Sequence, residues 1–206
     1  MNLFDKAVLL MTGLTALYMV WRFAQDQQAG RRPPLAVAYY IIAFSVLLAS
    51  GLLLIAFGYG ILESRMVVVV ASLIPVALSL GLVTEYAPSY AKAYTSFAVL
   101  GLIALAATRF AGPRPLSIIT LVLVHGVAGL VIFGLPLWFS FKGLAPGGFA
   151  WVGIGGGLIG IGGIALAFLK AGKPILPAEV ILLILAPLLL LMTASFAAGF
   201  LSSVRK

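Results

Sequence analysis

Residues 119–133, "ITLVLVHGVAGLVIF", place the chain's one histidine inside an apolar run. Apart from Thr120 and His125, every residue of this stretch is apolar or glycine. The apolar character extends over residues 116–139, and a helix needs about 20 such residues to cross the hydrocarbon core of a bilayer. The stretch therefore predicts a membrane-spanning helix with His125 near mid-depth.

The composition of the whole chain agrees with this reading. Of its 206 residues, 63% are hydrophobic and 9% are charged, whereas soluble domains carry roughly 25% charged residues. The net charge of +8 could suggest a nucleic-acid partner. The basic residues, however, lie in short runs between apolar segments, as membrane-flanking residues do. We therefore expect a lipid bilayer as partner and no nucleic acid. The absence of cysteine excludes disulfides and thiolate metal sites.

Seven apolar segments of membrane length follow one another along the chain. They are separated by short connections rich in Gly, Pro and charged residues, so no soluble domain is expected. The fold class predicted is all-α, a polytopic integral membrane protein with a seven-transmembrane-helix bundle forming a single domain over residues 1–206. The predicted segments are 4–24, 35–58, 65–85, 93–110, 116–139, 149–169 and 176–201.

The distribution of basic residues gives a preferred orientation in the cell (inner) membrane. Lysine and arginine divide almost evenly between the two sides of the predicted bundle, so the first hairpin decides. There Arg22, Arg31 and Arg32 outweigh Lys6. The expectation is an N-terminus outside and a C-terminus in the cytoplasm.

A weak internal repeat relates the first three segments to the last three. A shift of 112 positions brings Pro75, in "SLIPVALSL", onto Pro187, in "LILAPLLLL". A proline in the middle of a helix removes a backbone hydrogen bond and permits a kink. Three-plus-one-plus-three layouts occur in small-solute transporters. The alternative is two independent kinks at Pro75 and Pro187.

The stretch "GIGGGLIGIGG", residues 153–163, contains a G-x-G-x-x-G pattern. A dinucleotide site would need a strand, a turn and a solvent-facing helix start, and an apolar membrane segment supplies none of these. In a helix the glycines instead form a stripe that lets a neighbouring helix approach closely. A flexible substrate-binding helix or a slot for a lipid or pigment remains the alternative. The expected helix-packing residues are Gly153, Gly156, Gly157, Gly160 and Gly163.

The five acidic residues all lie away from segment centres. Glu179 is expected to cap the last helix, and Glu85, with Tyr86, Tyr90 and Tyr94, to belong to an interfacial aromatic belt. Without a carboxylate pair or an acid beside His125, the sequence predicts no catalytic residue, no metal site and no enzyme. Proton pumps also need ionisable groups within the membrane.

His125 has two interpretations. The first is a packing residue whose imidazole hydrogen-bonds to a neighbouring helix, for example to a carbonyl freed by a proline kink. The second is an axial ligand for a pigment or for a haem shared with another chain. One histidine cannot supply both axial ligands, so the cofactor stays unknown and none enclosed by this chain alone is favoured.

Two functions follow from these patterns. The first is an accessory or structural subunit of a larger, energy-transducing membrane complex, respiratory or photosynthetic, with other integral membrane subunits as partners. The alternative is a small-solute transporter or seven-helix membrane sensor with the three-plus-one-plus-three layout. Its central cavity would be lined by residues among Ser45, Ser72, Ser79, Thr120 and His125.

Overall fold

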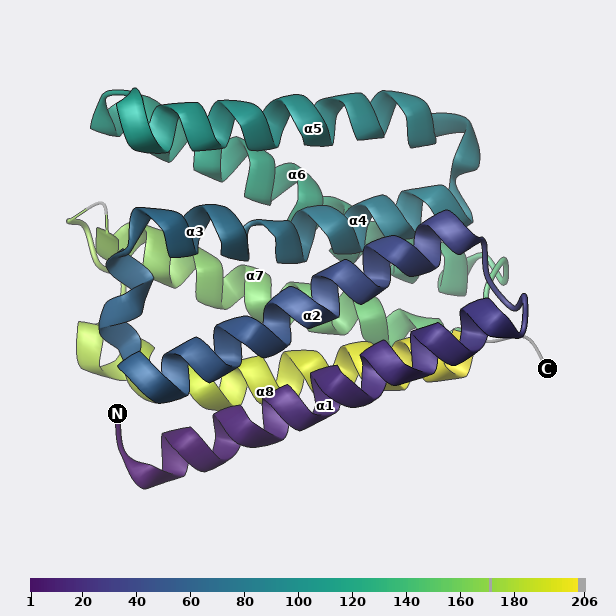
Figure 1. Cartoon of the computed structure of the whole chain (residues 1–206), viewed down its shortest axis with the longest axis horizontal. Helices are drawn as coiled ribbons and strands as arrows, with labels where there is room; N and C mark the ends of the chain where they lie inside the picture. The colour runs from purple at the N-terminus through teal and green to yellow at the C-terminus, as the bar shows by residue number, and fades with distance from the viewer. Residues whose placement is uncertain (171, 204–206) are drawn as a thin grey trace.

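The computed structural model describes residues 1–170 and 172–203, and the regular elements in them are all helices (Figure 1). Successive membrane segments run in opposite directions, and two short 3-10 helices, η1 and η2, lie at their connections. The elements are α1 Leu3–Gln28, α2 Pro34–Phe57, η1 Tyr59–Glu63, α3 Arg65–Ala71, α4 Leu73–Tyr86, α5 Pro88–Ala111, α6 Arg114–Phe141, η2 Gly147–Phe149, α7 Ala150–Lys170 and α8 Ala178–Ser203.

Seven helical segments in the described residues are long and apolar enough to cross a membrane, which confirms the number predicted. α3 and α4 together make one of these segments, and η2 adds a turn before α7. Local sequence sets the helix starts. Asn2 and Asp5 form a capping box at α1, and proline occupies the first turn of α2, α5 and α6, where its missing N–H costs nothing.

The third segment is interrupted at Ser72, between α3 and α4. Pro75 has no N–H to offer the carbonyl of Ala71, so one hydrogen bond of the regular ladder is missing at this point. The Ser72 hydroxyl instead donates to the Val68 carbonyl at 2.6 Å. Pro187 lies inside α8, which continues past it as one helix.

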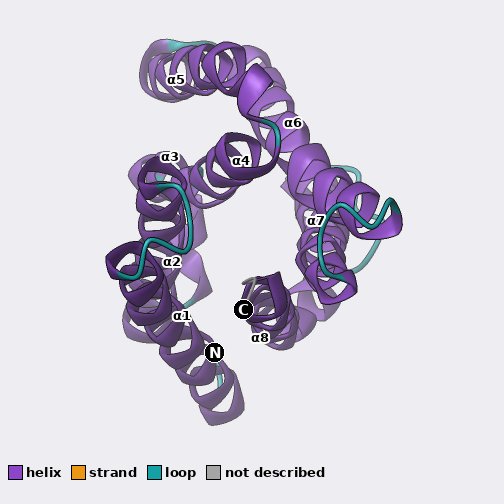
Figure 2. Ribbon diagram, turned by 90° about the vertical axis from the view of Figure 1, so that its right-hand side faces the viewer, coloured by secondary structure: helices purple, strands orange, loops and turns teal. Residues whose placement is uncertain are grey.

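Six of the seven segments form a closed ring, seen end-on in Figure 2. Going round it, α1 packs on α2, α2 on α4, α4 on α6, α6 on α7, α7 on α8, and α8 again on α1. α5 lies outside this ring and contacts α3, α4 and α6. Only Ala98 and Leu105 of α5 are buried.

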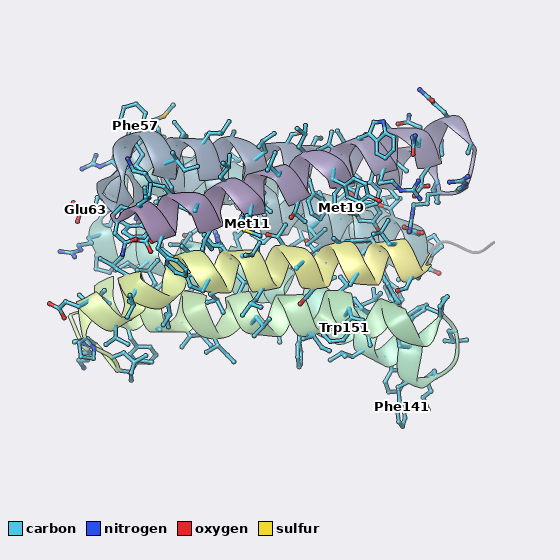
Figure 3. The ribbon with its side chains drawn as sticks, turned by 90° about the horizontal axis from the view of Figure 1, so that it is seen from below. Met11, Met19, Phe57, Glu63, Phe141 and Trp151 are labelled. Atoms are coloured by element: carbon cyan, nitrogen blue, oxygen red, sulfur yellow. The ribbon has the colours of Figure 1, made fainter. Side chains whose placement is uncertain are left out.

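Packing is concentrated at the end of the ring where α1, α4 and α8 finish. Every residue from Val76 to Val83 of α4 is buried, whereas no residue of α3 is. On α1 the contrast is between faces and not ends: Met19 is buried and Met11 is exposed, both labelled in Figure 3, and Leu9 nearer the N-terminus is also buried. The aromatic residues that fill this end are Phe23, Tyr40, Phe44, Tyr86, Phe149, Phe196 and Phe200.

Candidate functional site: an arginine cluster at one end of the ring

The connection between α1 and α2 turns Arg32 into the interior. Gly30 has φ +63°, a left-handed conformation that glycine adopts without a Cβ penalty. The next backbone N–H, from Arg31, donates to the Asp26 carbonyl at 2.9 Å and closes the turn. Pro33 and Pro34 then start α2. The side chain of Arg32 is thereby directed between the helix ends and is only 2% exposed.

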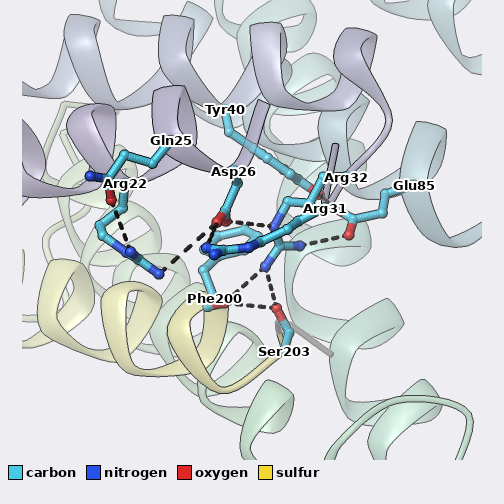
Figure 4. A network of polar contacts seen from close by, with 9 residues as sticks. All are labelled: Arg22, Gln25, Asp26, Arg31, Arg32, Tyr40, Glu85, Phe200 and Ser203. Carbon is cyan, nitrogen blue, oxygen red and sulfur yellow. Dashed lines mark hydrogen bonds and ion pairs between the residues drawn. The ribbon is translucent and has the colours of Figure 1, made fainter. Parts of the chain in front are cut away.

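Arg32 uses its guanidinium to join four segments (Figure 4). Nε lies 3.3 Å from Asp26 Oδ2 and Nη1 lies 2.6 Å from Glu85 Oε1. Nη2 donates to the Phe200 carbonyl at 2.9 Å and to the Ser203 hydroxyl at 2.7 Å. One side chain therefore ties the α1–α2 connection to the last turns of α1, α4 and α8.

The aromatic residues around the guanidinium complete its surroundings. The rings of Phe23 and Phe200 each lie 5.8 Å from its central carbon, within cation–π range. The Tyr40 hydroxyl donates to Glu85 Oε2 at 2.8 Å, so both oxygens of that carboxylate are engaged. The Tyr40 ring lies against Gly81, where a Cβ would overlap it. Glycine at position 81 is thus required by the position of Tyr40.

Electrostatics keep Arg32 charged. Burial alone would lower the pKa of its guanidinium, but Glu85, Tyr40 and Tyr86 together outweigh burial, so the pKa lies above its ordinary value. Arg32, Asp26 and Glu85 therefore form a group of ion pairs that is largely shielded from water. Such a group is costly to break, because removing one partner leaves an unpaired buried charge.

Two further arginines approach the cluster from its outer side. Arg31 Nη1 lies 3.2 Å from Asp26 Oδ1, and Arg22 Nη2 lies 4.0 Å from the same oxygen. Arg22 Nη1 also donates to Gln25 Oε1 at 3.0 Å. In Figure 4 both guanidinium groups approach the same oxygen of the Asp26 carboxylate. We use the name arginine cluster for Arg22, Asp26, Arg31, Arg32, Tyr40, Glu85 and Ser203.

Arg32 and Glu85 lie at the ends of membrane segments, as expected, but their side chains face the protein interior and not the surroundings of the bundle. Both lie inside the arginine cluster, because the turn at Gly30 and the end of α4 bring them together from 53 positions apart. The aromatic belt is also corrected in part. Tyr90 is exposed, but Tyr94 donates to the Ser79 hydroxyl at 2.8 Å in the interior. A weak signal existed: three of the chain's arginines lie within a few residues of Asp26.

His125 lies on α6 and is partly buried, with Nδ1 buried and without a hydrogen bond that satisfies distance and angle. The carbonyl that interacts with its imidazole belongs to Leu121, one turn earlier on the same helix. The carbonyl from a kinked neighbouring helix that the sequence suggested is therefore not its partner. A ligand role for His125 stays a prediction.

Most of the serine and threonine residues expected to line a cavity donate their hydroxyl hydrogen bonds within their own helices. Ser72, Ser79 and Thr120 donate to carbonyls three or four residues earlier. Ser45 is exposed on the outer face of α2, so it does not point into the ring. Ser72 and Ser79 are buried, as is Thr193 on α8.

The glycines of α7 divide into three groups. Gly153, Gly156 and Gly157 lie against α6: a Cβ on Gly156 would lie 2.8 Å from Ile132 Cγ2. Gly155 and Gly162 lie against α8, where Phe196 and Leu188 occupy the space. Gly160 and Gly163 have no atom within 4 Å of a Cβ, so the expected close approach does not extend to them within this chain.

The remaining acidic residues lie toward the other end. Glu179 is in the first turn of α8, at the position expected. Asp5 is buried in the first turn of α1, near Tyr59 of η1. Burial, reinforced by the Asp5 carboxylate, raises the pKa of Tyr59 to about 12.

The chemistry of the arginine cluster is that of binding and joining. It contains no nucleophile next to a base, and nowhere in residues 1–170 and 172–203 do three His, Asp or Glu side chains gather as a metal site. No protein-family model matches the chain, and neither the curated proteins nor the solved structures contain a match to it. The geometry of the ring and of this cluster is therefore the basis for assigning a function.

Proposed function

We propose that the chain is a carrier for a small neutral solute, built from two three-helix units. The first unit is α1, α2 and α4, the second is α6, α7 and α8, and α5 connects them. The observation that carries the proposal is the order of contacts round the ring. Exchanging one unit for the other leaves that order unchanged: α1–α2 corresponds to α6–α7, α2–α4 to α7–α8, and α1–α8 to α6–α4.

Repeated units of this kind are the common building plan of secondary transporters. A single connecting helix makes the two units enter the bilayer from the same side, so they are related by an axis along the membrane normal. Pro75 and Pro187 then fall on corresponding helices, α4 and α8. Rocking of one unit against the other would open first one end of the ring and then the other.

The arginine cluster supports the proposal because it joins the two units at one end of the ring and would close the entrance there. Asp26, Arg32 and Glu85 all belong to the first unit, while the Phe200 carbonyl and the Ser203 hydroxyl belong to the second. Every ion pair found in the described residues lies at this end. In the carrier proposed here, the contacts of Arg32 with α8 close one entrance and break when that entrance opens.

The solute class follows from what the middle of the ring offers. Ionisable groups within a membrane mark the paths of charged substrates. Between the two ends, the described helices carry the buried Thr193 hydroxyl and the partly buried imidazole of His125, whereas the Ser79 hydroxyl faces Tyr94 of α5, outside the ring. A neutral solute with hydrogen-bonding groups suits this interior better than an ion.

The proposal can be tested by distance measurements, because the chain has no native cysteine. Spin labels at Leu35 and Trp151 report the distance between α2 and α7 at the arginine-cluster end. Labels at Phe57 and Phe168 report it at the other end. All four side chains are exposed. In lipid nanodiscs, Ser203→Ala should add a longer distance to the first pair and a shorter distance to the second.

Ser202→Ala is the matched control, because the Ser202 hydroxyl donates to Gly199 of its own helix. It should leave both distance distributions unchanged. One fixed distance at each end, identical in wild type and Ser203→Ala, would contradict the carrier. Opposite changes at the two ends would support it, and uptake assays with purified protein would then identify the solute.

A second proposal is the accessory subunit of a larger membrane complex, to which one observation points. Gly126 and Gly129 on α6, like Gly160 and Gly163 on α7, have open space where a Cβ would lie. Such surfaces allow another helix to approach closely. Purification from native membranes distinguishes the two proposals: constant co-migration with other subunits favours the complex, and a monodisperse single chain favours the carrier.

A further inference from the structure

The charges of the arginine cluster do not balance. Among residues 1–170 and 172–203, three arginines face two carboxylates at this end, Asp26 and Glu85, so one positive charge has no carboxylate of its own there. Arg32 is not the group in excess, since it contacts both carboxylates. The surplus lies with Arg22 and Arg31, which share one oxygen of Asp26.

These two side chains are also accessible, unlike Arg32. Arg22 is 24% exposed and Arg31 is 45% exposed, against 2% for Arg32. The Arg31 side chain makes one hydrogen bond, from Nη1 to Asp26. The Nε of Arg22 is buried without a partner, and its Nη2 lies 4.0 Å from Asp26, beyond hydrogen-bond distance. Two guanidinium groups with unused N–H donors therefore lie side by side at the surface.

The surroundings of Arg22 place it at the depth of lipid headgroups. Tyr18 and Trp21 lie one turn before and immediately before it on α1, with ring centroids 5.8 Å apart. Both rings are exposed. Exposed Tyr and Trp mark the interface between headgroups and hydrocarbon. A ligand that contacts the guanidinium groups would thus lie above an aromatic surface suited to a glycerol backbone and the first carbons of an acyl chain.

We propose that Arg22 and Arg31 bind the phosphate of an acidic phospholipid. Guanidinium groups match phosphate oxygens in a forked, bidentate geometry, and a phosphate would supply the negative charge that the cluster lacks. The lipid would hold Arg22 and Arg31 in place beside Asp26 and so support the α1–α2 connection from outside. The inference does not depend on the transport proposal.

The test is lipid binding by native mass spectrometry of the full chain in detergent, with phosphatidylglycerol against phosphatidylcholine as probes. Each Arg near an anionic lipid surface contributes about fivefold in affinity, so Arg22→Gln/Arg31→Gln should weaken phosphatidylglycerol binding roughly 25-fold. The control, Lys92→Gln/Lys142→Gln, removes two exposed charges at the same end and should change binding less than about twofold. Equal losses in both variants would overturn the proposal.

Two further measurements separate a lipid site from a general anion site and from misfolding. Inorganic phosphate should not compete with phosphatidylglycerol, because it has no group to contact Tyr18 and Trp21; full competition would overturn the lipid assignment. Arg22→Lys/Arg31→Lys keeps both charges but loses the forks, so it should fold and bind phosphatidylglycerol about fivefold more weakly. Unchanged binding by this variant would refute bidentate recognition.

Discussion

Replacing Arg32 with methionine should destabilise the protein far more than the same change at Arg31. Both residues contact Asp26, and they are neighbours in the chain, so the comparison isolates burial. Arg32→Met removes the only cation that the described residues place within ion-pair distance of Glu85, whose side chain is 13% exposed. Breaking a buried pair in this way costs about 3–5 kcal/mol. The Arg31 pair is exposed and contributes about 0–1 kcal/mol.

Thermal unfolding in one detergent, followed by tryptophan fluorescence, measures the difference. For a chain of this size 1 kcal/mol corresponds to roughly 2–4 °C in Tm. Arg32→Met should therefore lower Tm by about 6–20 °C, and Arg31→Met by no more than about 4 °C. The Tm of Arg32→Lys should lie between those of the two methionine variants, because lysine keeps the charge but lacks the forked N–H donors of the guanidinium.

A double substitution tests whether the unpaired carboxylate is the cause. Adding Glu85→Gln to Arg32→Met removes the buried charge that the first change strands, so part of the lost Tm should return. Equal effects of Arg32→Met and Arg31→Met, or no recovery in the double variant, would refute the assignment of Arg32 as the central buried cation.

Three other predictions concern glycines and Tyr59. Gly156→Leu should destabilise by about 1–3 kcal/mol, because α6 lies against that position, while Gly160→Leu should be tolerated in the isolated chain; equal Tm losses would contradict this packing. Gly81→Ala should lower Tm and increase the exposure of Tyr40, whose ring fills the space; an unchanged Tm would count against it. The pKa of Tyr59 is raised to about 12, so the stability it contributes is present below pH 10 and lost between pH 10 and 12. In a pH titration followed by phenolate absorbance, Tyr59→Phe should remove a component that develops near pH 12. If the component that the substitution removes develops near pH 10, the Tyr59 hydroxyl is not buried.

The number and approximate ends of the membrane segments could be predicted, because apolar length alone decides them. The interruption at Ser72 could be placed only within a turn of Pro75, since proline removes a hydrogen bond one turn upstream of itself. The 3-10 helices η1 and η2 have no periodic signal. Their positions depend on how neighbouring helices pack.

The arginine cluster could not be predicted, for a physical reason. A basic residue beside an apolar segment usually lies in the headgroup region, and nothing local distinguishes Arg31 from Arg32. The two side chains differ in burial because the turn at Gly30 leaves Arg31 exposed and directs Arg32 into the interior. The lack of a neighbour at Gly160 within this chain has a related reason: periodicity gives the face of α7, but not how far along that face another helix packs.

The bonds made by Arg32 differ in kind between the two units, and this bears on how the closed end could open. Its partners in the first unit, Asp26 and Glu85, are charged, while its partners in the second, the Phe200 carbonyl and the Ser203 hydroxyl, are neutral. Separating the units would therefore leave the guanidinium still paired, and no buried charge would be stranded. Hydrogen bonds to a charged group contribute about 1.5–3 kcal/mol each, and breaking them does not add the cost of an unpaired buried charge. The contacts between the units are thus the part of the cluster that can break reversibly, as alternating access in the proposed carrier requires.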